Sequence, residues 1–195
     1  GDALLRAGLI LNELGKSETA LRNFKRALDL KDLPRETRAV AVFGLIQSSY
    51  ARCDYKAVID TYIANATSMP GDDLRPKLLL MVGNAHKQKQ SYRQAIEVYL
   101  MIETQSPDAP ESLEAGYQKL LAFYQLGDKD MPRFTESFEE RYAPGHKDHE
   151  YLLMSRLIRA DWWFAKSDYA KAAEAFAGID SKRVPEKVRA GVLYK

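Results

Sequence analysis

Residues 90–99 read QSYRQAIEVY, and two other stretches repeat the pattern: KSETALRNF at 16–24 and SDYAKAAEAF at 167–176. In each stretch an alanine is followed four residues later by an aromatic residue, giving the pairs Ala20 and Phe24, Ala95 and Tyr99, and Ala172 and Phe176. Positions four apart share one face of a helix, so the alanine lets a neighbouring helix approach while the aromatic ring fills the space beside it. The chain therefore contains an internal helical repeat.

A second small residue lies twelve positions before each alanine, at Gly8, Gly83 and Ala160. Apolar residues flank it at helical spacing, as Leu79 does before Gly83, which indicates a first helix ahead of each second one. We expect the small residues of the two helices to face each other in a tightly packed antiparallel pair. Gly15, between the first two helices, suits the left-handed conformation that ends a helix.

This arrangement resembles the tetratricopeptide repeat (TPR) family, whose 34-residue unit is a helix-turn-helix. The matching positions are Leu4, Gly8, Leu11, Gly15, Ala20, Phe24, Ala27 and Pro34 in the first unit, and Leu79, Gly83, Tyr92, Ala95, Tyr99 and Pro107 in the third. Two further units, over 40–62 and 116–142, are more degenerate. The resemblance implies an all-α fold, a right-handed superhelical solenoid of antiparallel helix pairs with a concave inner surface.

The distance from Ala20 to Ala95 covers two periods, or about 37 residues each. We therefore expect a single solenoid of about five units, over approximately 1–34, 35–71, 72–109, 110–146 and 147–184, with the first helix of a sixth at 185–195. Because the chain ends inside that predicted helix, we interpret it as a fragment of a longer repeat protein. No stretch alternates with period two, so we expect no β-sheet.

Composition excludes several kinds of partner and chemistry. The chain carries 29 Lys plus Arg against 27 Asp plus Glu, a net charge of +2, which argues against nucleic acid or an anionic membrane as partner. The longest apolar runs, such as Leu78–Val82, are much too short to span a bilayer. The single cysteine, Cys53, excludes an intramolecular disulfide and sites that need several thiolates. We interpret Cys53 as a small packed or half-exposed thiol.

No sequence motif indicates catalysis. The chain has no glycine-rich phosphate loop, no Gly-x-Ser-x-Gly and no His-Glu-x-x-His, so we expect no enzyme activity, no cofactor and no metal. His146 and His149 could supply metal ligands together with Asp148 or Glu150, but a solvent-exposed segment that opens a helix fits them better. We expect His86 to be a packed core residue.

Trp162 and Trp163 form the most conspicuous aromatic pair. Neighbouring positions point about 100° apart on a helix, so one ring can be buried while the other is not. We expect Trp163 in the core and Trp162 between repeats or at the surface.

The family resemblance implies that the first helices line the concave surface. Carried over position by position, the lining residues are Leu5, Leu9, Asn12 and Glu13; Lys77, Leu80, Asn84, Lys87 and Gln88; Tyr117, Leu121, Tyr124 and Gln125; and Leu157, Asp161, Phe164 and Ala165, with Gln47 and Tyr50 in the uneven second unit. The candidate partner-binding residues among them are Leu80, Asn84, Lys87, Tyr117, Leu121, Tyr124, Leu157, Asp161 and Phe164. In the alternative interpretation, these side chains cover neighbouring helix ends or pack against sequence outside this chain.

A carboxylate clamp of the co-chaperone type is not expected. Its first-repeat Lys and Asn positions hold Leu5 and Leu9 here, which cannot donate a hydrogen bond to a carboxylate. Only Asn84 and Lys77 match part of that clamp.

The predicted function is therefore a non-catalytic scaffold or adaptor that binds a peptide or partner protein in its concave groove. The alternative is a structural spacer within a longer repeat protein, with self-association through apolar residues Val188, Val192 and Tyr194 near the end of the chain. Residues 92–124 are also similar to the repeats of bacterial outer-membrane-assembly lipoproteins and Tol-Pal-associated periplasmic proteins, which implies the bacterial periplasm or cell envelope as location.

Overall fold

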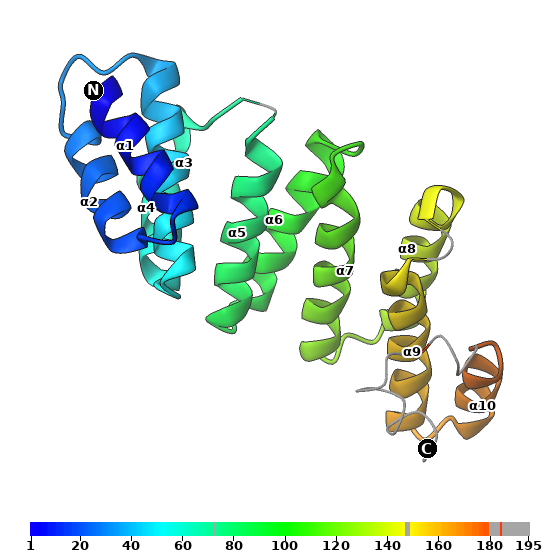
Figure 1. The fold of residues 1–195 in the computed structure, drawn as a ribbon. Helices are drawn as coiled ribbons and strands as arrows, with labels where there is room; N and C mark the ends of the chain where they lie inside the picture. The colour runs from blue at the N-terminus through cyan, green and yellow to red at the C-terminus, as the bar shows by residue number, and fades with distance from the viewer. Residues whose placement is uncertain (72, 147–148, 180–183, 185–195) are drawn as a thin grey trace. The chain divides into compact units, whose positions relative to one another are not determined.

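The computed structural model describes residues 1–71, 73–146, 149–179 and 184. Over these residues it contains ten α-helices, one short 3₁₀-helix and no strand (Figure 1). The predicted all-α fold is therefore confirmed for the described part of the chain. None of the helices found there is long and apolar enough to cross a membrane.

The chain forms two compact units, Gly1–Ala115 and Gly116–Lys195, which are described one at a time. Unit 1 contains the helices α1 (Asp2–Glu13), α2 (Ser17–Leu28), α3 (Arg35–Ala51), α4 (Tyr55–Ala64), η1 (Ala66–Ser68), α5 (Arg75–Gln88), α6 (Tyr92–Gln105) and the start of α7 (Pro110–Gln125). The first helices pack directly on one another, α1 on α3 and α3 on α5. Helix α2 lies against both α1 and α3, and α4 lies against both α3 and α5.

The turns between first and second helices share one backbone conformation. Gly15 and Gly127 have φ angles of +71° and +65°, which confirms the left-handed turn expected at Gly15. Cys53, Gln90 and Ser167 adopt the same conformation, with φ between +57° and +61°. Every predicted helix pair thus turns at a left-handed residue, whether or not that residue is glycine.

Phe24 of α2 is completely buried between two glycines from successive first helices. A Cβ atom added to Gly8 of α1 would lie 2.7 Å from Phe24 Cε1, and one added to Gly44 of α3 would lie 2.3 Å from Cζ. Tyr99 of α6 makes the equivalent contact with Gly83, at 2.5 Å. In these pairs the glycine of a first helix therefore packs against the aromatic ring of a second helix.

Unit 2 contains the remainder of α7 together with α8 (Met131–His146), α9 (Glu150–Ala165) and α10 (Tyr169–Ala177). Helix α9 packs against both α8 and α10. The predicted sixth first helix, at 185–195, lies outside the described residues, as do Val188, Val192 and Tyr194.

The prediction was wrong for Trp163, which is not a core residue, whereas Trp162 lies between two predicted units, one of the two places expected for it. Trp162 is the buried member, at 9% exposure, and its indole N–H donates a hydrogen bond to the Asp128 carbonyl over 3.1 Å. Trp163 is half-exposed. The reason is register: Trp162 lies two residues after the small residue Ala160, the position that Ile46 occupies after Gly44 on α3, where it is completely buried.

We predict that Gly44→Ala lowers the free energy of unfolding by about 1–3 kcal/mol, because the added methyl group collides with a ring that cannot move. The loss should outweigh the ~0.5–1 kcal/mol that alanine normally gains over glycine inside a helix. Urea unfolding followed by circular dichroism measures it. The matched control is Gly145→Ala in α8, where an added Cβ meets no described atom within 4 Å. Equal stability changes in the two variants would contradict the packing described above.

Candidate partner-binding surface

Asn12 links α1 to α3, the first helices of the first two helix pairs in unit 1. Its amide group donates to the Gly44 carbonyl over 3.3 Å and to Gln47 Oε1 over 3.1 Å. The Ser48 hydroxyl in turn donates to Asn12 Oδ1 over 2.7 Å. A residue predicted to line the groove is therefore engaged in holding α1 to α3, while its neighbours Leu5 and Leu9 are half-buried against the core beneath.

Asn84 is engaged in a similar way on α5. The Tyr99 hydroxyl donates to Asn84 Oδ1 over 2.7 Å. Burial raises the pKa of the Tyr50 phenol, and a hydrogen bond with Asn84 opposes that rise. One amide side chain thus connects α3, α5 and α6, and its hydrogen bonds are made within unit 1.

Lys87 lies half-buried one turn beyond Asn84, beside Glu114 of α7. Burial lowers the pKa of the Lys87 ammonium, and the Glu114 carboxylate opposes this effect. The structure therefore gathers Tyr50, Asn84, Lys87 and Glu114 from three successive first helices. Leu80, also predicted, is half-buried against the hydrophobic core.

Glu114 was missed by the sequence analysis. It lies two residues before Gly116, in one of the degenerate units, at a position that the family pattern does not mark. Only the packing of successive first helices reveals that it faces Lys87.

Two of the residues predicted in unit 2 are core residues. Tyr117 is 8% exposed. Its ring stacks on that of Tyr151, with centroids 4.4 Å apart, and is tilted against that of Phe138, with centroids 6.5 Å apart. Burial raises the pKa of Tyr117 to about 12. Leu157 is 4% exposed. Both side chains stabilise the unit and offer little surface to a partner.

Four other predicted residues of unit 2 keep part of their surface exposed. They are Leu121 and Tyr124 on α7 and Asp161 and Phe164 on α9, all half-buried. Phe164 packs edge-on against Tyr169 of α10, with ring centroids 5.4 Å apart. These four are the candidate partner-binding residues of unit 2 that remain accessible, and the predicted lining residues Gln125 and Ala165 are exposed as well.

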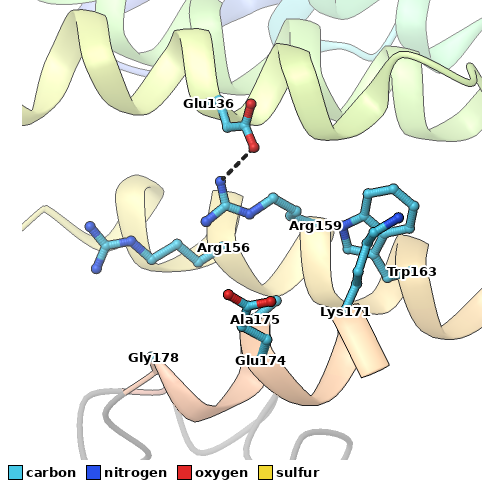
Figure 2. Close-up of a pocket in the computed structure, with 8 residues that line it drawn as sticks. All are labelled: Glu136, Arg156, Arg159, Trp163, Lys171, Glu174, Ala175 and Gly178. Carbon is cyan, nitrogen blue, oxygen red and sulfur yellow. Dashed lines mark ion pairs between the residues drawn. The ribbon is translucent and has the colours of Figure 1, made fainter. Parts of the chain in front are cut away.

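Unit 2 also contains a charged cleft that the sequence analysis did not find. It encloses about 520 Å³ and is lined by Glu136, Arg156, Arg159, Trp163, Lys171, Glu174, Ala175 and Gly178 (Figure 2). In sequence these charges look like ordinary solvated helix faces, because no short spacing links residues from three helices.

The other residues singled out in the sequence are the three histidines and Cys53. His149 caps α9 by accepting a hydrogen bond from the Tyr151 N–H over 3.2 Å, and its ring lies 6.2 Å from that of His146. Three or more side chains able to hold a metal ion do not come together anywhere in the described residues. His86 is half-buried, and this burial lowers its pKa. Cys53 is exposed at its turn, so the expectation of a packed or half-exposed thiol was wrong.

Comparison with known proteins places this geometry in a structural class. No protein-family model and no curated protein matches the chain. Two solved structures from Podosopora anserina do, and both are described as a kinesin light chain with nearly identical TPR-like repeats, one of them carrying a single substitution. Each aligns with a TM-score of 0.62 over 90% of this chain and 91% of its own, at 16% sequence identity. The chain has a TPR-like fold.

We predict that Tyr117→Phe reduces the loss of stability at alkaline pH. The folded pKa of Tyr117, about 12, lies above the ordinary value of 10.0, so its stabilising contribution is complete below pH 10 and is lost as pH rises through 12. Removing the hydroxyl should reduce that loss by roughly 2–3 kcal/mol. Urea unfolding at a series of pH values measures the effect. Tyr169→Phe, at a ring that is 60% exposed, is the control and should behave as the unmodified protein. An unchanged alkaline profile for Tyr117→Phe would show that this phenol is not buried.

Proposed function

We propose that the protein is a non-catalytic interaction scaffold that binds a peptide or partner protein on the face formed by its first helices. TPR-like repeat folds are generally protein-interaction scaffolds. In unit 1 the first helices pack directly on one another, so their outward faces adjoin.

The observation that carries the proposal is that the first helices of each unit, taken separately, keep aromatic and charged side chains partly exposed. In unit 1 these are Tyr50, Lys87 and Glu114, arranged around Asn84. In unit 2 the corresponding accessible aromatic residues are Tyr124 and Phe164. Aromatic side chains with a partly buried base lose little conformational entropy on binding, which favours them as anchors for a partner. Location in a bacterial cell envelope stays a prediction from residues 92–124.

We predict that Tyr124→Ala and Phe164→Ala each weaken binding to a partner at least about fivefold, as truncation of an anchor residue does. A pull-down with the unmodified chain supplies the partner, and its affinity for each variant is then measured by calorimetry. Leu100→Ala and Ile63→Ala are the matched controls, because these residues on the second helices are 47% and 66% exposed. The proposal fails if both anchor variants bind as tightly as the unmodified chain, or if the controls weaken binding equally.

One observation favours the second candidate function, a spacer whose faces pack against flanking protein. Ile10 of α1 is 56% exposed, although Ile46, in the same register on α3, is completely buried in unit 1, where α2 packs on α3. Leu14, one turn further along the chain, is 63% exposed. Helix α1 therefore exposes an apolar face, whereas the residue in the same register on α3 is buried.

As a spacer, the isolated chain is expected to self-associate through this α1 face. Sedimentation velocity over a roughly hundredfold range of concentration should show a rising mass for the unmodified chain and for the control Ile63→Lys, but not for Ile10→Lys. A mass that is independent of concentration in the unmodified chain would argue against the spacer function.

A further inference from the structure

Helix α1 and the residue that ends it carry an apolar stripe on the exposed face. Ile10 and Leu14 are 56% and 63% exposed. Ala3, which is exposed, and Ala7, which is half-buried, continue the stripe toward the start of the helix. The four positions are separated by four, three and four residues, which is the a and d spacing of a coiled coil. The stripe is therefore a surface suited to packing along another helix.

The stripe is complementary in size to a second copy of itself that runs in the opposite direction. If Ile10 lies opposite Ala7 of the second copy, Leu14 lies opposite its Ala3, and a two-fold axis generates the reverse pairs. Each large side chain then faces a small one, which lets the two helices approach closely. A parallel pair would instead place alanine against alanine and leucine against leucine.

An apolar hollow adjoins Ala3 at the start of α1. It has a volume of about 630 Å³, and Leu30 and Leu33, from the segment between α2 and α3, contribute to its lining. Leu30 is 40% exposed. In the antiparallel pair, Leu14 of the second copy lies over this hollow, so two exposed apolar surfaces cover each other.

Charges beside the stripe select the antiparallel direction. Arg6 and Glu13 are exposed and lie seven residues apart, at the g positions of the same heptad register. In an antiparallel pair the g positions of the two helices face each other, so Arg6 of each copy meets Glu13 of the other, and the ion pair forms twice. In a parallel pair Arg6 would face Leu11, and both ion pairs would be lost.

We propose that α1 is a self-association surface on which a second copy of the chain packs its own α1 in the antiparallel direction. The product is a closed dimer with two-fold symmetry, formed by the apolar stripe and by two Arg6–Glu13 ion pairs. The proposal rests on the exposed α1 face that the spacer function uses, and it names what covers that face. It does not involve Tyr124 and Phe164, the anchors proposed for a partner.

Charge reversal tests the pairing. In sedimentation velocity, the mass of the unmodified chain should rise with concentration toward twice that of the monomer and no higher. Arg6→Glu and Glu13→Arg should each raise the dissociation constant of the dimer at least about fivefold, because each places like charges together twice. The double variant should restore the dimer. Lys25→Glu, a reversal at an exposed position on α2, is the control and should leave the constant unchanged.

Disulfide cross-linking tests the direction. All variants also carry Cys53→Ser, because the Cys53 thiol is exposed. Chains with Ala3→Cys mixed with chains with Leu14→Cys should cross-link to each other. Neither variant should cross-link to itself, because the two copies of either residue lie about 16 Å apart along an antiparallel pair. Ile63→Cys, at an exposed position on α4, is the control and should not cross-link to either variant.

Three results would overturn the proposal: a mass that stays at that of the monomer, cross-linking of each variant to itself but not to the other, or a double charge variant that associates no better than the single reversals. The first result would also contradict the spacer function. The second and third would leave the spacer function standing, because the chain would still self-associate.

Discussion

The contact of the Phe24 ring with Gly8 and Gly44 is the constraint on which the rest of unit 1 depends. The ring closes its own helix pair against α1 and at the same time fixes α3, the first helix of the next pair. Tyr99 closes the third pair in the same way against Gly83. In repeat proteins stability is roughly the sum of the units and their nearest-neighbour interfaces. A ring that belongs to both a unit and its interface therefore makes the folding of one pair depend on the next.

The same close approach determines which side chains are left to meet a partner. Because the glycines let first helices lie near one another, Asn12 reaches Gln47 and Ser48, and Asn84 reaches Tyr99. The Asn12 and Asn84 side chains therefore stabilise the packing of the helices. Side chains next to these hydrogen-bonded amides stay partly exposed, such as Lys87 beside Glu114. In unit 2, Tyr117 is buried in an aromatic cluster, whereas Tyr124 and Phe164 stay partly exposed.

The sequence correctly predicted the features that depend on the spacing of residues close together in the chain. The four-residue separation of Ala20 and Phe24 gave the helix pairs, and Gly15 gave the turn, because both features act within a few residues of chain. It failed where burial depends on another helix: Trp162 and Trp163 are equally plausible core residues until the turn at Asp128 supplies an acceptor for one of them. The register of the repeat indicates which positions on the first helices could line a groove. The hydrogen bonds of Asn84 and the place of Glu114 beside Lys87 depend on neighbouring helices, so the sequence does not indicate them. The charged cleft has no sequence signal, since it is assembled from three helices.

Native-state hydrogen exchange on Phe24→Leu tests the central claim most directly, namely that one ring couples successive helix pairs. The account predicts that backbone amides of α1, α2 and α3 lose protection together, while those of α6 are much less affected, because the smaller side chain leaves a gap against both Gly8 and Gly44. Loss of protection confined to α2, with α3 exchanging as in the unmodified chain, would contradict it.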